Sequence, residues 1–232
     1  MRGASPDRGR MSESETAGRV QTYVESGPSL GRIISFSDGV FAVAITLLVL
    51  SIDVPNIPQK LADRRLPEAL RALWPHYFAF ALSFIIIGTF WFSHHALFLY
   101  VRRHDRRFMW LNLLFLMCIV FLPFPTAIVS RYGDTSVGTI FYAVAMAVTS
   151  FMLALLFVYA LSGKRLVEDD FDELLGRHIV LNYVTMGFIF LVSTGIAFIN
   201  TSAAKYFWLL IWADTLVLER IYRRARWAKA YG

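Results

Sequence analysis

Long apolar runs recur six times along this chain, and each is long enough to cross a membrane as a helix. A helix needs about 20 mostly apolar residues to span the hydrocarbon core of a bilayer, where only helices and closed barrels satisfy every backbone hydrogen bond. The sequence therefore predicts an all-α integral membrane protein with six transmembrane helices. Their approximate ranges are 33–53, 73–100, 108–130, 137–162, 179–199 and 204–219.

The composition agrees with a membrane protein. Hydrophobic residues make up 56% of the 232 residues, and the mean hydropathy is +0.52, whereas soluble domains hold about 45–50% apolar residues. The one cysteine, Cys118, lies inside an apolar run, so no disulfide framework is expected. The net charge of +6 comes from short basic clusters between the runs, a pattern that indicates membrane topology and no nucleic-acid partner.

The basic residues predict the orientation of the spans. If the N-terminus is cytoplasmic, most Lys and Arg residues fall in cytoplasmic segments, as the positive-inside rule requires. We therefore expect both termini in the cytoplasm and a multi-pass protein of the cell (plasma) membrane. Residues 1–31 are expected to form a disordered cytoplasmic tail, residues 32–220 the transmembrane domain, and residues 221–232 a basic cytoplasmic tail.

Two connections are long enough to have structure of their own. The outer connection 54–72 contains three prolines and leads into an amphipathic stretch, LPEALRAL. The inner connection 163–178 mixes both charge signs and is interpreted as a solvated linker or a surface helix.

The first span begins with an unusual polar pair, Ser37 and Asp38, in the stretch FSDGVFAVAITLLVL. A carboxylate at membrane depth costs a few kcal/mol even on lenient scales, so it needs a partner or a water-filled cavity. Candidate partners are Arg32 on the same helix and His94 or His95, which end the second span at the same depth. On a helix Asp38 points away from the face of Val43.

Three motifs together resemble the transmembrane protein 175 family of cation channels. They are the R-x-x-x-F-S-D opening at 32–38, WFSHH at 91–95, and LNLLFLMCIVFLPFPTA at 111–127. The resemblance implies a potassium-permeable channel in which the first helices of a homotetramer surround a central pore, without a carbonyl-lined filter loop. The implied partners are identical subunits, the lipid bilayer and permeant monovalent cations such as K⁺, and no cofactor is implied.

Helical spacing places Gly39, Val43, Thr46 or Leu47, and Leu50 along one face of the first span. Copies of this face around an axis would form apolar rings that gate by dewetting, whereas a single copy would simply be a packing surface. The resemblance assigns the narrowest position to Val43 and outer rings to Leu47 and Leu50, with a hydroxyl ring at Thr46. Ile or Leu is usual in the family at position 43, and the shorter Val bears on how tightly the neck closes and on potassium selectivity.

Polar and aromatic residues at the inner ends of the first two spans are expected to form a packing network that fixes the pore helix. Direct ion contact and proton sensing by Asp38 are the alternatives. His94 and His95 are adjacent and diverge on a helix, so they are poorly placed to share a metal ion. The expected network consists of Arg32, Phe36, Ser37, Asp38, Trp91, His94 and His95.

Other polar residues within the spans have structural interpretations. Pro123 and Pro125 are expected to kink the third span, and Asn112 and Asn182 to cap helices or bond between them. Asp214 in the last span is a functional candidate, although a hydrogen bond to a neighbouring polar group is the simpler interpretation.

The common enzyme motifs are missing from the sequence, so an enzyme is not expected. The alternatives to a channel are a proton-coupled secondary transporter, which would use Asp38, the two histidines and Asp214, and an intramembrane metalloenzyme at the inner leaflet.

Overall fold

The computed structural model describes residues 30–162, 166–167 and 172–211, and this part of the chain is almost entirely helical. Its regular elements are α2 (Leu30–Leu47), η1 (Leu48–Ser51), η2 (Gln59–Leu61), α3 (Ala62–Ala72), α4 (Trp74–Tyr100), α5 (Arg106–Phe121), α6 (Pro123–Tyr132), α7 (Ser136–Leu161), α8 (Glu173–Ile199) and α9 (Thr201–Phe207). An isolated bridge pairs Val101, just after the end of α4, with Val167, which follows the end of α7.

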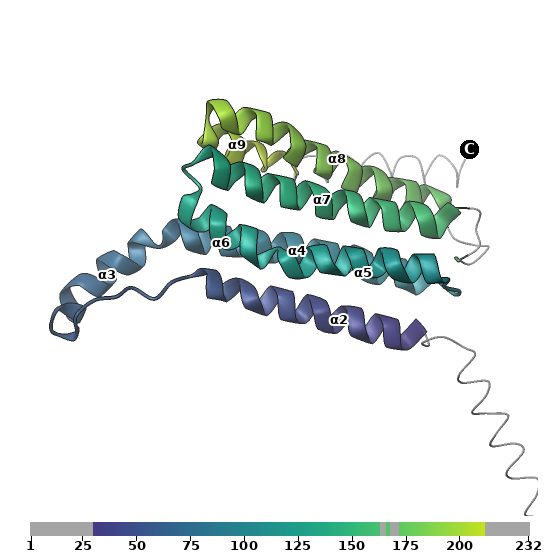
Figure 1. The fold of residues 1–232 in the computed structure, drawn as a ribbon, viewed down its shortest axis with the longest axis horizontal. Helices are drawn as coiled ribbons and strands as arrows, with labels where there is room; N and C mark the ends of the chain where they lie inside the picture. Colours follow the sequence, from purple (N-terminus) through teal and green to yellow (C-terminus); the bar gives the residue numbers. More distant parts are fainter. Residues whose placement is uncertain (1–29, 163–165, 168–171, 212–232) are drawn as a thin grey trace, which may run out of the picture.

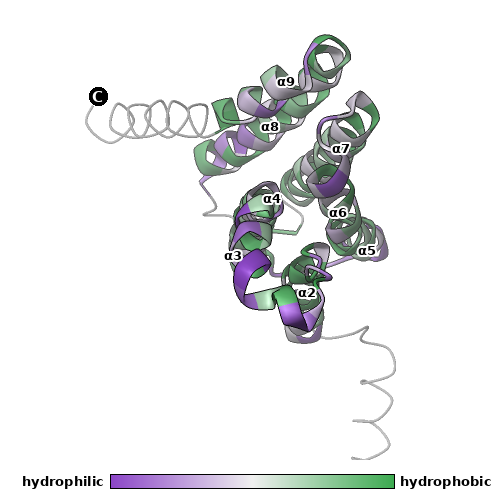
Figure 2. Ribbon diagram, turned by 90° about the vertical axis from the view of Figure 1, so that its left-hand side faces the viewer, coloured by the Kyte–Doolittle hydropathy of each residue, from purple (hydrophilic) through white to green (hydrophobic). Residues whose placement is uncertain are grey.

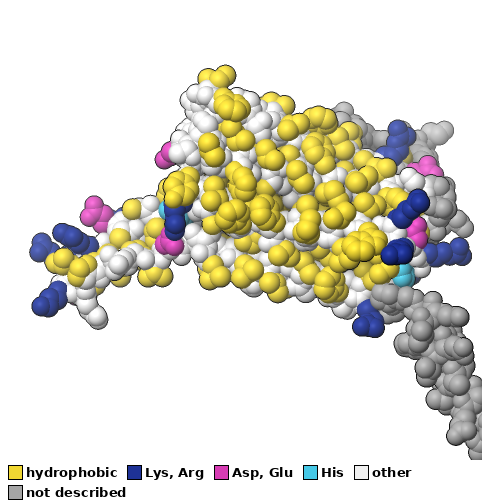
Figure 3. All heavy atoms as spheres, viewed as in Figure 1, with side chains coloured by type: hydrophobic (Ala, Val, Ile, Leu, Met, Phe, Trp, Pro, Cys, Tyr) yellow, Lys and Arg dark blue, Asp and Glu magenta, His cyan; other side chains and the backbone are white. Residues whose placement is uncertain are grey.

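Five of the six expected spans are present as helices long and apolar enough to cross a membrane. They are Leu30–Ser51, Trp74–Tyr100, Arg106–Tyr132, Ser136–Leu161 and Glu173–Ile199. Figure 3 shows the matching surface, a broad hydrophobic belt with charged side chains gathered at its two ends. The sixth expected span, 204–219, overlaps α9 and otherwise lies largely outside the described residues, as do nearly all of the expected N-terminal tail and the whole expected C-terminal tail.

The long helices run side by side, with α2 at one edge of the bundle (Figure 1). Viewed from the end, α2 lies against α4 and α5, while α8 and α9 lie at the opposite edge (Figure 2). Helices α7 and α8 pack tightly: a Cβ atom added to Gly187 would stand 2.6 Å from the Phe151 ring. Small residues at such contacts let helices approach within a membrane.

The third span is broken where the sequence predicted a kink. Helix α5 ends at Phe121 and α6 begins at Pro123, because a proline nitrogen cannot donate to the preceding turn. Just beyond the break, Thr126 donates to Ser83 Oγ at 2.9 Å, and Ser83 lies 3.1 Å from the Tyr142 hydroxyl. This polar cluster joins α6, α4 and α7 in the core.

The connections differ from the sequence-based expectation in their bounds. Helix α8 begins at Glu173, where the Asp172 carboxylate accepts from the Leu174 N–H at 3.0 Å. The expectation that the inner connection runs to residue 178 is therefore wrong, because an N-cap starts the span about two turns earlier. The expected amphipathic piece of the outer connection is present as α3, which begins at Ala62.

Candidate functional site

Helix α2 has one side in the bundle and one side outside it. Its buried residues, Ile33, Ser37, Phe41 and Ala44, follow one another at spacings of three or four and continue into Leu48 of η1. This spacing is that of one helix face. The helix is thus fixed along a single stripe, and everything opposite that stripe is available to lipid or to another subunit.

The residues expected to line a pore lie together on the exposed side. Val43 is 54% exposed, Leu47 is 38% exposed and Leu50 is 73% exposed, and Gly39 and Thr46 are also exposed. The structure of a single chain therefore places the expected residues on one surface, opposite the stripe that packs into the bundle.

The end of this surface at Leu50 differs in geometry from a continuous α-helix. Residues Leu48–Ser51 form a 3₁₀ turn, in which residues three apart are eclipsed and the rise is about 2 Å per residue. Leu50 is thereby kept in line with Leu47, and the stretch from Val43 to Leu50 spans about 12 Å. The Thr46 hydroxyl donates to the Val43 carbonyl at 2.8 Å, which leaves its oxygen able to accept.

The partner of Asp38 is a tryptophan. Trp91 Nε1 donates to Asp38 Oδ1 at 2.9 Å, which links α2 to α4 near the ends where α2 begins and α4 finishes. A charge-assisted hydrogen bond of this kind compensates part of the cost of placing a carboxylate at membrane depth. Arg32, His94 and His95 do not take this position.

A second link lies one residue earlier and is fully buried. The Asn112 side chain of α5 donates to Ser37 Oγ at 3.2 Å, and its Oδ1 lies 2.8 Å from His94 Nε2. Ser37 in turn donates to the Ile33 carbonyl at 2.9 Å. Helices α2, α5 and α4 are therefore joined through one amide, with Ser37, His94 and Asn112 each at most 2% exposed.

Aromatic rings enclose His94. Its ring lies 5.5 Å from Phe41, 5.6 Å from Phe115 and 4.7 Å from Phe98, measured between centroids. His95 points elsewhere and stacks on Trp91 at 5.6 Å. Within the described residues no three His, Cys, Asp or Glu side chains come together in a group that could hold a metal ion.

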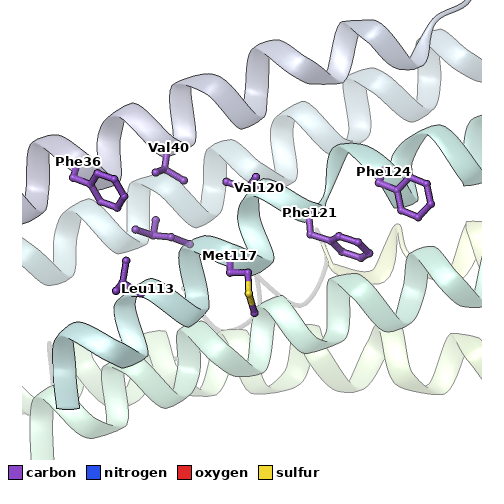
Figure 4. A pocket seen from close by; sticks show the side chains of 8 residues that line it. Phe36, Val40, Leu113, Met117, Val120, Phe121 and Phe124 are labelled. Atoms are coloured by element: carbon purple, nitrogen blue, oxygen red, sulfur yellow. The ribbon is translucent and has the colours of Figure 1, made fainter. Parts of the chain in front are cut away.

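Two residues of the expected network lie apart from these contacts. Arg32 is exposed and forms no hydrogen bond or ion pair with a described residue. Phe36 is 55% exposed and lines an apolar groove between α2 and α5 (Figure 4).

Two further polar residues were singled out in the sequence. Asp214 lies outside the described residues. Asn182, on α8, borders a different pocket, between α8 and α4.

The sequence predicted only part of the role of Asn112, which joins α2, α4 and α5. An amide inside an apolar helix signals a bond between helices, but the sequence does not say with which one. Phe41, Phe98 and Phe115 carry no such signal, since aromatic residues are common throughout the spans.

Comparison with known proteins shows which family the chain resembles. The family described as the endosomal/lysosomal potassium channel TMEM175 matches residues 32–123, which include α2 and the helices that hold Trp91, His94 and Asn112. A protein of Streptomyces collinus named a potassium channel is 35% identical over 73% of this chain and 83% of its own length. One of Chamaesiphon minutus, also named a potassium channel, is 37% identical over 73% of this chain and 85% of its own.

A solved structure agrees. The crystal structure of a lysosomal potassium-selective channel TMEM175 homolog from Chamaesiphon minutus superposes with a TM-score of 0.69 at 33% identity, covering 82% of this chain and 97% of that one. The comparisons identify ion channels and not enzymes. On the strength of relatives above 30% identity that it matches over more than four fifths of their length, this chain belongs to the TMEM175 family of channels.

Proposed function

We propose that this protein is a passive potassium-permeable cation channel in which four identical subunits place α2 around a central pore. The observation that carries the proposal is the two-sided helix α2, packed along one stripe and exposed along the other. Relatives that are named potassium channels support the choice of ion. The proposal includes a sixth span, a cell-membrane location, cytoplasmic termini and no bound cofactor.

The pore surface of the proposal consists of Gly39, Val43, Thr46, Leu47 and Leu50. Rings of apolar side chains in a narrow neck exclude water, and a hydrated cation that enters loses contacts that nothing replaces. Val43 would form the narrowest ring, with Leu47 and Leu50 as the rings toward the outer end.

In this proposal the contacts of Ser37 and Asp38 position the pore helix. They hold α2 from two directions, since the Asp38–Trp91 bond comes from α4 and the Ser37–Asn112 bond from α5. Both bonds lie at the end of α2 opposite Leu50. They would fix the rotation of the helix about its axis, which decides which side chains face the ion.

The function can be tested with purified protein in planar bilayers. The reversal potential is measured with potassium on one side and sodium on the other, at two pH values. We expect single-step currents whose reversal follows the potassium gradient. Saturable flux with a fixed proton stoichiometry would contradict the channel proposal and indicate a coupled transporter.

A further inference from the structure

The apolar end of the proposed pore face is followed closely by a carboxylate, Asp53. Between Asp38 and Asp53 the sequence contains no charged residue. Asp53 follows Leu50 by three positions, so the Cα atoms of the two residues are at most about 11 Å apart. Along this chain, Asp53 is therefore the first charge beyond the last apolar ring.

An arginine from another helix holds Asp53 in place. Arg131, in the last turn of α6, donates to the Asp53 carboxylate. Helix α6 packs against η1, the turn that contains Leu50, so the pair lies beside the end of the pore face. Both side chains are more than half exposed, and their charges therefore act on ions in the surrounding water.

The two charges of this pair have opposite effects on a cation. A carboxylate beside the mouth of an apolar neck raises the local cation concentration, whereas a guanidinium lowers it. Identical subunits around an axis would repeat either effect in each subunit. While Asp53 is bonded to Arg131 the two effects largely cancel, and removal of either charge leaves the other unbalanced.

We propose that Asp53 and Arg131 set how readily cations enter the pore at its Leu50 end, with Asp53 attracting cations and Arg131 limiting that attraction. This inference rests on the proposed function, since it requires the exposed face of α2 to line the ion path. It differs from a purely structural role, in which the pair would only tie the end of the pore helix to α6.

The test compares the unitary potassium conductance in planar bilayers at 10 mM and at 1 M KCl. Charges about 10 Å from an ion act on it at the lower salt concentration, where the Debye length is about 30 Å, and are screened at the higher, where it is about 3 Å. D53N leaves Arg131 unbalanced and should lower the conductance at 10 mM, whereas R131Q leaves Asp53 unbalanced and should raise it. We expect changes of about three- to eightfold, the effect of four unit charges about 10–15 Å from the ion path in water.

Three further variants separate charge from structure. The double variant D53N/R131Q should return the conductance at 10 mM to near the wild-type value, and R131K, which keeps the charge, should leave it unchanged. Lys205→Gln is the matched control, because it breaks an exposed ion pair with Asp134 on α9, at the edge of the bundle opposite α2 (Figure 2). It should change the conductance at 10 mM less than twofold. At 1 M KCl every variant should match the wild type.

Changes in the same direction for D53N and R131Q, or changes that persist at 1 M KCl, would overturn the proposal and indicate a structural tie. Unchanged conductance in both variants, or an equal effect of K205Q, would overturn it as well. A wild type that conducts potassium while the variants fail these expectations leaves the proposed function standing. A wild type without potassium current would refute the proposed function and this inference with it.

Discussion

Asn112 joins two buried polar side chains, one of them on α2. Its amide serves both Ser37 and His94 in a place that water does not reach. A buried polar group that loses its partner bears its full desolvation cost, about 1–3 kcal/mol. Ser37 keeps a second bond, to the Ile33 carbonyl, so the cost of losing the amide falls mainly on His94.

Replacing this amide should therefore destabilise the fold. We expect Asn112→Leu to lower the free energy of unfolding by about 1–3 kcal/mol, measured by denaturant titration in detergent. Asn182→Leu is the control, because the Asn182 side chain is only half-buried and forms no hydrogen bond with a described residue. Similar losses in both variants would show that the Ser37–Asn112–His94 link contributes nothing specific.

Asp38 allows its charge to be separated from its hydrogen bond. In Asp38→Asn the amide oxygen can still accept from Trp91, whereas Trp91→Phe removes the donor and keeps an aromatic ring. If Asp38 serves to position α2, the potassium conductance of D38N should stay within about twofold of wild type. W91F should reduce it several-fold. A large change in D38N with little change in W91F would instead indicate that the carboxylate acts on the ion or on protons.

At the scale of elements, α2 ends in a way that suits a pore. The change from α-helix to 3₁₀ turn after Leu47 keeps Leu50 above Leu47 while Leu48 and Ser51 stay buried. An α-helix continued to Ser51 would have rotated Leu50 away from Leu47. The 3₁₀ turn thus extends the exposed apolar face from Leu47 to Leu50, while Leu48 and Ser51 keep their packing in the bundle.

Polar substitution along this edge should open the neck. Val43→Ser and Leu47→Ser are each expected to raise basal potassium flux into liposomes several-fold, because a hydroxyl stabilises water in an apolar constriction. Val49→Ser is the matched control, since Val49 is also exposed, at 52%, but precedes Leu50 on another side of the turn. Unchanged flux in both pore variants, or an equal rise with V49S, would remove α2 from the pore wall.

How much the sequence predicts depends on the kind of signal. Apolar length alone located five spans, and Pro123 located the break between α5 and α6, because both signals depend on local chemistry. The partner of Asp38 depends on how α2 and α4 are rotated against each other, which no local pattern contains. The negative charge of Asp38 suggested Arg32 or a histidine as its partner. In the structure the partner is Trp91, whose neutral indole N–H donates to the carboxylate. The start of α8 at Glu173 was missed because its polar first turn resembles a linker.

At the scale of the whole molecule, the placement of charge is the main guide to orientation. The described surface has an apolar belt between two charged ends (Figure 3). One of these ends is also held by exposed ion pairs. Arg131 of α6 pairs with Asp53, which follows η1, and Lys205 of α9 pairs with Asp134 in the connection between α6 and α7. Exposed pairs of this kind contribute little because solvent screens them, so apolar packing and buried hydrogen bonds hold the bundle together.

The number of spans can be decided by the sides on which the termini lie. An even number puts both ends on one side, and the excess of Lys and Arg predicts the cytoplasm. In a Cys118→Ala background, single cysteines at Ser12 and Ala230 should react with an impermeant maleimide only after cells are opened. A cysteine at Asn56, in the connection after α2, should react in intact cells. Labelling of Ala230→Cys but not Ser12→Cys from outside would mean that residues 204–219 do not cross the membrane, because five crossings place the termini on opposite sides.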